Sequence, residues 1–386
     1  MKERQAAMNL EFGKAVEDII DVNVVKELKQ SPDIIIFGAG ESGIWVARWL
    51  RSQGIFPKCF CDNYEVKWGG IKDGLPIMSF DSAMEKYPRA AICVASMWAE
   101  DILKQIGAMD GRLLLRSWDL LKSMAWETSD MVYKSGESRF IKENLCEFNA
   151  LYDALEDEYS KNTLEGVLNY RLTRDKSYLD NIKSNEDVYL DKTIISSTKI
   201  DSIVRGTIVD GGAFDGDTVD MLIRRLGKMH ILNICCFEAE EHNGNKIEEK
   251  LPTWSPHQIH IHKAALWNGT GDSMVFEGDG LSGGIKKATN FRNHGINTQR
   301  LDDCGYDNIS VIKLDIEGAE REALKGAERI IKKCRPVLAI CAYHLQDDLL
   351  CLWEILRTIG GGNYKLYLRH YMRSSGDTIL YAIPTE

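Results

Sequence analysis

Acidic residues surround two glycines in the stretch TIVDGGAFDGDTVD, which covers residues 207–220. An apolar, strand-like run ends at Asp210, the glycines follow, and Asp215 and Asp217 open a helix-like segment. Glycine-rich turns between a strand and a helix usually bind phosphates, because backbone N–H groups and the helix dipole attract anions. Acids at this place would repel a pyrophosphate. The stretch therefore predicts a ligand that has no phosphate and carries a cationic centre.

S-adenosylmethionine fits such a turn, since it carries an ammonium and a sulfonium. The two glycines would let the backbone approach the cofactor closely. Asp210 and Asp215 are expected to face the ammonium, directly or through water. The turn residues predicted to bind the cofactor are Asp210, Gly211, Gly212, Phe214, Asp215 and Asp217.

The next strand-like run ends in CCFEAE, with Glu238 at the strand end. An acid at this position of a nucleotide-binding fold can accept hydrogen bonds from both ribose hydroxyls. The alternative interpretation is a solvated acid at a strand end. Phe237, Ala239 and the later KAAL segment, with Ala264 and Ala265, are then expected to line the adenine site.

Two further strand ends carry groups that can do chemistry. VIKLDIEGAE places Asp315 at a strand end and Glu317 and Glu320 at the start of a helix, and PVLAICAYH ends at His344. Methyl transfer depends on positioning of the acceptor, and a hydroxyl acceptor also needs a base. His344 is the natural base by its ordinary pKa, while Asp315 or Glu317 can orient it or act directly. Glu320 can equally be an acid that stabilises the helix dipole, and His370 is a weaker candidate base.

Metal binding is less well supported by the sequence. Acids near a reaction centre can hold Mg²⁺, but their spacing here does not demand it. His260 and His262, in HIH, could form a metal-binding pair on one strand face. Because no third ligand is near them in the sequence, we interpret them as surface or core histidines.

The elements that must position these residues alternate between strands and helices from about residue 201 onward. The last two strand candidates, YKLYLRH and TILYAI, are joined by a short connection and predict an antiparallel hairpin. Five parallel strands that close with such a hairpin form the sheet plan of class I methyltransferases. The strand candidates are TIVD, ILNICCFE, QIHIHKAAL, VIKLD, PVLAICAYH, YKLYLRH and TILYAI.

A second glycine turn, GAGESG, lies near the start of the chain. Gly38, Gly40 and Gly43 have the GxGxxG spacing, follow an apolar strand and open a helix, and Asp62 ends the next strand. Glu41 at the helix start weakens the case for a pyrophosphate there. Two interpretations stay open: a site for a nucleotide, a nucleotide-sugar or a dinucleotide, and an interaction domain that keeps the fold.

The whole chain is expected to be α/β, with two Rossmann-like domains joined by helices. Residues 121–200 are charged, follow the helical period of 3.6 residues and read as a linker or a cap, whose surface could pair two chains in a homodimer. The predicted segments are an N-terminal helix over 1–30, a small Rossmann-like domain over 31–120, the helical segment over 121–200, and the larger domain over 201–386.

Composition favours a cytoplasmic protein with no nucleic-acid partner. The formal net charge of −10 argues against a nucleic-acid partner. The chain has no apolar run of transmembrane length, and its N-terminus does not resemble a secretory signal. Its ten cysteines show no metal-binding spacing, and we interpret those in apolar runs as reduced core residues.

Residues 200–384 resemble the FkbM-type methyltransferases. The resemblance rests on TIVDGGAFDGDTVD, FEAE, HKAALWNGTGD, RLDD, VIKLDIEGAEREALKGAERIIKKCRPVLAICAYH and the closing hairpin. Residues 33–120 resemble the small Rossmann-like domain found ahead of some FkbM and sugar-modifying enzymes.

The resemblance implies S-adenosylmethionine-dependent O-methylation. The family resemblance of residues 200–384 also implies a small-molecule or glycan acceptor, namely hydroxyls of sugars in surface polysaccharides or glycolipids, or of secondary metabolites. Two alternatives come from other functional classes. One is a nucleotide-sugar oxidoreductase or isomerase that uses the N-terminal domain, although the sequence has no hydride-transfer signature. The other is a non-catalytic protein that binds S-adenosylmethionine.

Overall fold

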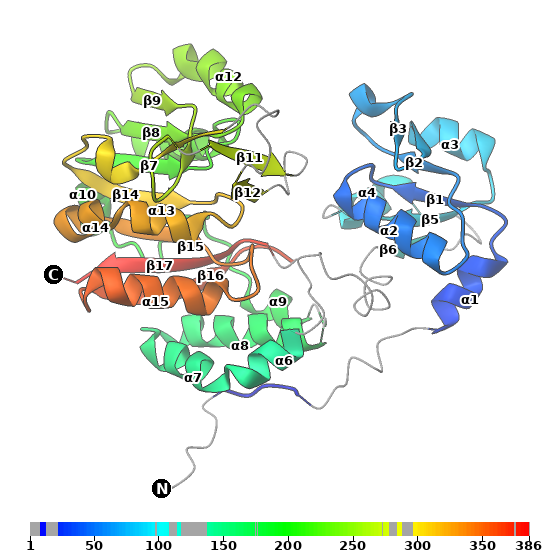
Figure 1. The fold of residues 1–386 in the computed structure, drawn as a ribbon, viewed down its shortest axis with the longest axis horizontal. Helices are drawn as coiled ribbons and strands as arrows, with labels where there is room; N and C mark the ends of the chain where they lie inside the picture. The colour runs from blue at the N-terminus through cyan, green and yellow to red at the C-terminus, as the bar shows by residue number, and fades with distance from the viewer. Residues whose placement is uncertain are drawn as a thin grey trace, which may run out of the picture. The chain divides into compact units, whose positions relative to one another are not determined.

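The chain folds as two compact units (Figure 1). Unit 1 comprises Met1–Leu10, Glu137–Arg171 and Asp175–Glu386, and unit 2 comprises Glu11–Gly136 and Leu172–Arg174. Unit 2 is therefore inserted in the chain of unit 1. The computed structural model describes residues 8–12, 22–96, 99–107, 114–116, 137–173, 175, 177–271, 273–277, 284–287, 296–373 and 376–385.

Unit 1 is built on a seven-stranded sheet in the order β16-β17-β15-β14-β7-β8-β9. The five strands from β15 to β9 are parallel, and β17 runs antiparallel to both of its neighbours. This confirms the predicted sheet plan and the C-terminal hairpin. The strands are β7 (Thr207–Gly211), β8 (Asn233–Phe237), β9 (Gln258–His262), β14 (Ile309–Leu314), β15 (Val337–Cys341), β16 (Tyr364–His370) and β17 (Thr378–Pro384).

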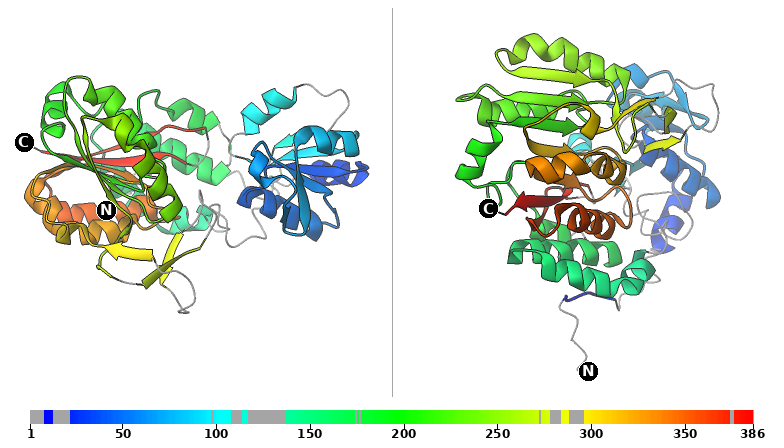
Figure 2. Two further views of the ribbon diagram at one scale, coloured as in Figure 1. Left: turned by 90° about the horizontal axis from the view of Figure 1, so that it is seen from above. Right: turned by 60° about the vertical axis from the view of Figure 1, so that its left-hand side comes forward.

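Helices cover both faces of this sheet, which explains why its inner strands are continuous apolar runs. The left view of Figure 2 shows the strands nearly edge-on, with the orange helices on one side and green helices on the other. One layer consists of α10 (Ser197–Ile203), α11 (Asp217–Leu222) and α12 (Glu241–Lys250). The other consists of α13 (Glu320–Gly326), α14 (Glu328–Cys334) and α15 (Asp348–Gly360). Among the described helices, none is long and apolar enough to cross a membrane.

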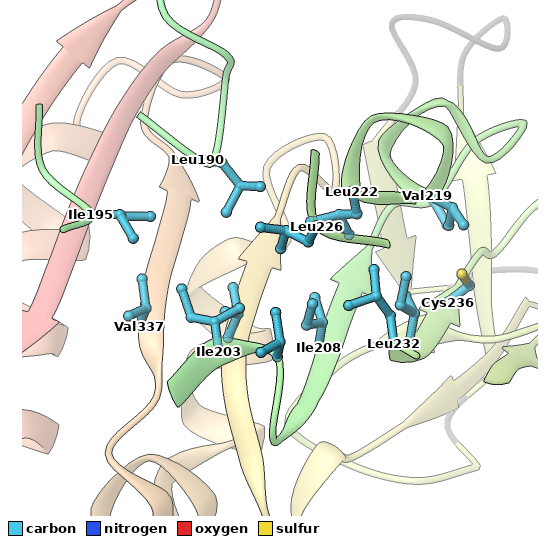
Figure 3. Packing of buried hydrophobic residues seen from close by; sticks show 14 of the residues in the cluster. Leu190, Ile195, Ile203, Ile208, Val219, Leu222, Leu226, Leu232, Cys236 and Val337 are labelled. Atoms are coloured by element: carbon cyan, nitrogen blue, oxygen red, sulfur yellow. The ribbon is translucent and has the colours of Figure 1, made fainter. Parts of the chain in front are cut away.

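The core between the sheet and the first helical layer also includes residues that precede α10. Leu190 and Ile195 pack in one buried cluster with Ile208 of β7, Val219 of α11 and Val337 of β15 (Figure 3). Burial of an aliphatic side chain of this size contributes about 1.5–3 kcal/mol. The segment before α10 is thus attached to the sheet by its own core residues.

A second, smaller sheet lies in the same unit and was not predicted. It has the order β10-β13-β11-β12. We expected QIHIHKAAL to form one strand, and this is wrong. β9 ends at His262, and Ala265 pairs with Thr298 of the second sheet. Its strands are β10 (Ala265–Leu266), β11 (Ser273–Glu277), β12 (Gly284–Lys287) and β13 (Ile296–Gln299).

The helical segment ahead of the sheet is part of unit 1. It contains α6 (Glu137–Glu143), α7 (Leu145–Ala154), α8 (Glu158–Thr173) and α9 (Ser177–Ile182). Arg369 of β16 is only 1% exposed and holds this segment through Asp157 at 2.8 Å and Ser160 at 2.8 Å. The predicted helices are therefore present, but they pack on the sheet instead of forming a free linker.

We expected one helix over residues 1–30, and the described residues of this segment do not form one helix. Met8 is buried, and the backbone of Asn9 bonds with Glu165 at 3.1 Å and with Asn169 at 2.9 Å, both on α8. Residues 8–12 are not helical, and α1 (Val22–Gln30) belongs to unit 2. Residues 1–7 and 13–21 lie outside the described residues.

Unit 2 is a smaller Rossmann-like sheet in the order β3-β4-β2-β1-β5-β6. Its strands are parallel except for the β3–β4 pair. The apolar strand predicted before the GAGESG turn is confirmed at Ile34–Phe37, and the next predicted strand at Cys59–Cys61. The elements are β1 (Ile34–Phe37), α2 (Glu41–Ser52), β2 (Cys59–Cys61), β3 (Ile71–Lys72), β4 (Leu75–Met78), α3 (Phe80–Lys86), β5 (Ala91–Val94), α4 (Ala99–Ile106) and β6 (Leu114–Arg116).

The ten cysteines all lie among the described residues and are free. Those of β2, β5, β8 and β15 are buried in the two cores. The interpretation of these cysteines as small apolar core residues is thus confirmed.

We expect Arg369→Met to lower the free energy of unfolding of unit 1 by about 3 kcal/mol, because it breaks a largely buried ion pair. Arg373→Met is the matched control, since the side chain of Arg373 is 59% exposed where it pairs with Asp180. An exposed pair contributes less than about 1 kcal/mol. Urea titrations of both variants measure the difference. Equal losses would contradict the conclusion that Arg369 anchors the helical segment.

Candidate active site

A cavity of about 280 Å³ lies at the carboxyl ends of β7, β8 and β14 in unit 1. In doubly wound sheets this edge is where ligands bind. The structure brings most of the predicted residues together here. The cavity is lined by Tyr189, Gly212, Phe214, Asp217, Thr218, Phe237, Glu238, Ala239, Glu240, Asn243, Ala264, Ala265, Leu266, Lys313, Asp315, Ile316 and Glu317.

The glycine turn approaches β14 so closely that no side chain fits at Gly212. Its φ is +74°, and a Cβ there would lie 1.8 Å from the carbonyl oxygen of Asp315. The Gly212 N–H donates to the carbonyl of Phe237 at 2.9 Å. The turn is therefore a backbone cradle between β8 and β14, while the close approach of its glycines to a cofactor stays a prediction.

The two acids expected to face an ammonium do not line this cavity. Asp210 is fully buried beneath it and pairs with Lys313 at 2.9 Å. Lys313 also donates to the carbonyl of Gly212 at 2.7 Å. Burial alone would lower the pKa of Lys313, but the charges of Asp210 and Asp315 raise it above its usual range. Asp215 lies 3.6 Å from Lys250.

Lys313 is thus a site residue that the motif search missed. It follows two apolar residues inside β14, where a lysine is unusual, and its register partner on β7 is Asp210. A lysine and an acid are almost never fully buried unless they are paired, so their places inside two apolar strands could have indicated this pair. The pair supports the turn from below, and Lys313 also lines the cavity.

Glu238 lines the cavity and is held by the backbone. Its two carboxylate oxygens accept from the N–H groups of Phe214 and Glu240, each at 2.8 Å. Burial raises the pKa of Glu238. Glu238 is 8% exposed, and its carboxylate keeps lone pairs that can accept hydrogen bonds from a ligand.

The adenine wall predicted from Phe237 has a second aromatic layer behind it. Phe237 stacks on His262 with ring centroids 4.4 Å apart and an interplanar angle of 7°. The Nε2 atom of His262 lies 2.8 Å from the hydroxyl of Tyr306. His262 is therefore a packing residue, which agrees with the interpretation of HIH as core or surface histidines.

Asp315 is surrounded by donors. Its Oδ2 accepts from the hydroxyl of Tyr189 at 3.0 Å, and its Oδ1 accepts from the hydroxyl of Tyr343 at 3.1 Å. Nε2 of His344 lies 3.3 Å from Oδ1. Burial alone would raise the pKa of Asp315, but the hydrogen bond from His344 and the charge of Lys313 hold it well below its usual range. Asp315 is therefore a permanently ionised carboxylate.

His344 is placed as a charged partner and not as a free base. Its side chain is 8% exposed, with Nδ1 3.1 Å from Glu320 and Nε2 3.3 Å from Asp315. Burial alone would lower the pKa of His344, but Glu320 and Asp315 raise it well above the ordinary value. An imidazolium between two carboxylates cannot take another proton. The sequence-based expectation that His344 is the base by its ordinary pKa does not fit this environment.

Glu320 lies at the start of α13, where it can interact with the helix dipole, and it also lies next to His344. It is fully buried, accepts from the N–H of Ile316 at 2.8 Å at the start of α13, and faces His344. His370, the weaker base candidate, is fully buried in β16 with Nδ1 2.9 Å from Thr378, and it does not line the cavity.

Glu317 is a cavity-lining carboxyl whose surroundings disfavour its ionised form. Burial, together with the charges of Asp315 and Glu320, raises the pKa of Glu317 to about 7. Its side chain is 34% exposed, and its φ is +55°, in the left-handed region that disfavours side chains. A carboxyl with this pKa can accept a proton near neutral pH.

Backbone strain gathers at this cavity. Six non-glycine residues have positive φ among the described residues, and three of them line the cavity: Tyr189, Phe214 and Glu317. Asp377 is a fourth residue with positive φ, outside the cavity lining. Each such residue costs on the order of 1–3 kcal/mol, and strain of this kind is common at active sites. Asp377 and Tyr189 were not predicted from the sequence. Burial and the charge of Asp315 raise the pKa of Asp377 to about 6, which places it in the same electrostatic cluster.

The described residues offer one group with metal-ligating atoms close together, Glu320, His344 and Asp348, within 4.8 Å. Its members already have partners: Arg321 lies 2.9 Å from Asp348, and His344 faces Glu320. An ion-pair network accounts for the cluster. Nothing in it calls for Mg²⁺, which stays an untested prediction.

The glycine turn of unit 2 is closed by its own acid. Asp62 accepts from the N–H of Ala39 at 2.9 Å and pairs with Lys67 at 2.9 Å. Gly38 has φ +115°, and a Cβ on Gly43 would lie 2.0 Å from the Gly38 carbonyl oxygen. Both glycines are needed for the turn itself, while Gly40 faces open space. A nucleotide or nucleotide-sugar at this turn stays a prediction.

Comparison with known proteins agrees with the geometry of unit 1. Residues 210–374 match the model of the methyltransferase FkbM domain. The crystal structure of methyltransferase FkbM from Methylobacillus flagellatus KT is similar to 96% of this chain and 98% of its own, with 23% identity and a TM-score of 0.64. A putative methyltransferase from Streptococcus mutans in complex with SAH matches 49% of this chain and 96% of its own, with 10% identity and a TM-score of 0.31. No curated protein sequence matches significantly.

We expect Glu317→Gln to stabilise unit 1 at pH 8 relative to the wild type, and much less at pH 5. Because the folded pKa is raised, the folded state holds this proton more tightly than the unfolded chain. That contribution to stability is therefore lost as the pH rises toward about 7. Urea titrations at the two pH values test this. Glu322→Gln on α13 is the control, because Lys325 and Asn268 outweigh burial and lower the pKa of Glu322. A parallel pH dependence of Glu317→Gln and the wild type would contradict the assignment.

The match and the cavity coincide closely. Every cavity-lining residue except Tyr189 lies within the matched segment. The fold of the whole chain, insertion included, is shared with a solved FkbM methyltransferase. Residues 210–374 are thus an FkbM methyltransferase domain, and the chain that carries it is an S-adenosylmethionine-dependent methyltransferase.

Proposed function

We propose that unit 1 transfers the methyl group of S-adenosylmethionine to a hydroxyl of a sugar or of a secondary metabolite, with Glu317 as the base. The observation that carries the proposal is the pair of cavity-lining carboxyls Asp315 and Glu317. Their environments move their pKa values in opposite directions. Such a separation is a general sign of divided catalytic roles.

The groups that line the cavity support S-adenosylmethionine as its ligand. Gly212 lines the cavity, and its positive φ and the close approach of the Asp315 carbonyl require a glycine there for the turn itself. Glu238 is held so that it can accept from ribose hydroxyls, and Phe237, Ala264 and Ala265 supply an apolar wall for adenine. When bound, S-adenosylmethionine supplies an electrophilic methyl group on a positively charged sulfur.

The residues of this chain then have two tasks. Glu317 accepts the hydroxyl proton while the acceptor oxygen bonds to the methyl carbon and the sulfur–carbon bond breaks, its electron pair staying on sulfur. Since the Glu317 side chain is 34% exposed, the proton can pass to water afterwards. Asp315 stays ionised throughout, held by His344 and two tyrosines.

The acceptor class is supported by the resemblance of residues 200–384 to FkbM-type proteins. We would incubate the protein with deuteromethyl-labelled cofactor and a panel of neutral glycosides, amino sugars, nucleotide-sugars and polyols. Mass spectrometry then locates the label. A labelled hydroxyl supports the proposal, whereas label on nitrogen or carbon in place of oxygen would overturn it.

We expect Glu238→Ala to weaken binding of S-adenosylhomocysteine by about 1–3 kcal/mol, because two ribose hydroxyls lose their acceptor. Isothermal titration calorimetry measures the change. Glu241→Ala, exposed in the first turn of α12, is the control and should bind as the wild type does. Unchanged affinity of Glu238→Ala would remove the ribose assignment.

We expect Glu317→Gln to lower kcat by about 10²–10⁴-fold with nearly unchanged cofactor affinity, since the amide cannot accept the proton. In the wild type, kcat/KM should rise with pH and level off above about 7, as Glu317 becomes ionised. Initial rates across pH 5–9 give both results. Glu322→Gln is again the matched control, and full turnover by Glu317→Gln would show that the base lies elsewhere.

A further inference from the structure

We propose that Tyr189, which lies outside the matched FkbM segment, completes the cofactor site by fixing the carboxylate of Asp315 against the ammonium of S-adenosylmethionine. Tyr189 is thus a positioning residue, and Asp315 is the group that contacts the cofactor. The inference rests on the cofactor assignment and is independent of which acceptor is methylated.

The first step is to ask which acid is free to face an ammonium. Asp210 is neutralised by Lys313 under the turn, and Asp215 lies beside Lys250. Glu238 is engaged by two backbone N–H groups at the opposite side of the turn. Asp210 and Asp215 thus have lysine partners, and Glu238 is assigned to the ribose hydroxyls.

Four other acids line the cavity: Asp217, Glu240, Asp315 and Glu317. Glu240 accepts from Asn243 at 2.9 Å, and Glu317 is the proposed base. Asp217 opens α11 and accepts from the N–H of Thr218 at 2.7 Å. Asp315 follows the end of β14, beside the Gly212 cradle, and its backbone N–H donates to the Gly211 carbonyl at 3.1 Å. Its Oδ1 already has the hydroxyl of Tyr343 and the ring of His344. The geometry therefore favours Oδ2 of Asp315 as the ammonium acceptor.

Tyr189 sets the orientation of that oxygen. Its hydroxyl donates to Oδ2 at 3.0 Å, while its ring has the ammonium group of Lys313 5.3 Å from its centroid. With Tyr343 on Oδ1, the two phenols hold the carboxylate at both oxygens. A hydrogen bond to one lone pair of Oδ2 leaves the other for a ligand.

The backbone of Tyr189 shows that the fold holds it in this place. Its φ of +67° is unfavourable for a bulky residue. The Tyr189 N–H donates to the hydroxyl of Tyr381 at 2.9 Å, which lies 2.6 Å from the hydroxyl of Tyr371. Tyr371 in turn donates to buried Asp191 at 3.0 Å.

The next residue along the chain adds an apolar anchor. Leu190 is 5% exposed and packs in the core with Ile208 of β7 and Val219 of α11 (Figure 3). The strained backbone of Tyr189 is therefore fixed from both sides, by the tyrosine network and by the core. Since strain costs free energy, a conformation held this firmly is consistent with a role in the site and not with a connection alone.

A double-mutant cycle tests the proposal through cofactor binding, without any acceptor. S-adenosylhomocysteine, which keeps the ammonium, is titrated into the full-length wild type, Tyr189→Phe, Asp315→Asn and the double variant. We expect Tyr189→Phe to bind about five- to tenfold more weakly and Asp315→Asn about 10- to 100-fold more weakly. In the Asp315→Asn background, Tyr189→Phe should cost less than about twofold, because the group it orients is gone.

Methylthioadenosine, which lacks the ammonium, separates positioning from general damage to the fold. Tyr189→Phe should bind it as the wild type does. Tyr159→Phe, which loses a hydrogen bond at 3.2 Å in the helical segment away from the cavity, is the matched control and should bind both ligands normally.

Several outcomes would overturn the proposal. These are equal losses from Tyr189→Phe in both backgrounds, equal losses for both ligands, or a loss in Asp217→Asn in place of Asp315→Asn. Failure to find a methylated hydroxyl would leave these binding results unchanged, so the two proposals fail separately.

Discussion

The buried ion pair between Asp210 and Lys313 is the interaction on which the site depends. It joins the two central strands of the sheet, β7 and β14, directly below the glycine turn. A buried ion pair recovers its desolvation cost only when the two charges are well oriented and their remaining hydrogen-bonding groups have partners. Here the lysine also bonds to the Gly212 carbonyl, so the pair fixes the turn that the ligand must approach. The same ion pair therefore supports the floor of the cavity and fixes the shape of the turn.

The remaining acids at the cavity differ in their partners, and this separates their chemical roles. Glu238 is held by backbone N–H groups and Asp315 by an imidazolium and two phenols, while Glu317 lies farther from the same imidazolium, at 3.6 Å, and burial raises its pKa. Carboxyls that look alike in the sequence therefore range from permanently ionised to half-protonated near neutral pH. The proposed division of labour follows from these partners and not from the residue types.

The matched segment is smaller than the structural unit that supports the site. Residues 137–171 and the stretch before α10 pack on the sheet through Arg369 and the shared core. Tyr189 reaches the cavity from this part of the chain. The segment predicted as a linker or a cap is therefore part of the methyltransferase unit, and its residue Tyr189 lines the cavity.

The sequence by itself determined the sheet plan, the strand ends and most of the cavity-lining residues. Apolar strands, glycines in a tight turn and acids at strand ends are local patterns, and strand ends in a doubly wound sheet meet at one edge. The short strands of the second sheet escaped prediction because their pairing is with distant residues. Only the tertiary structure decided which acids are free, because Lys313, His344 and Tyr189 reach their partners across the fold. Protonation and strain depend on such distant neighbours, which is why we propose Glu317 in place of His344 as the base.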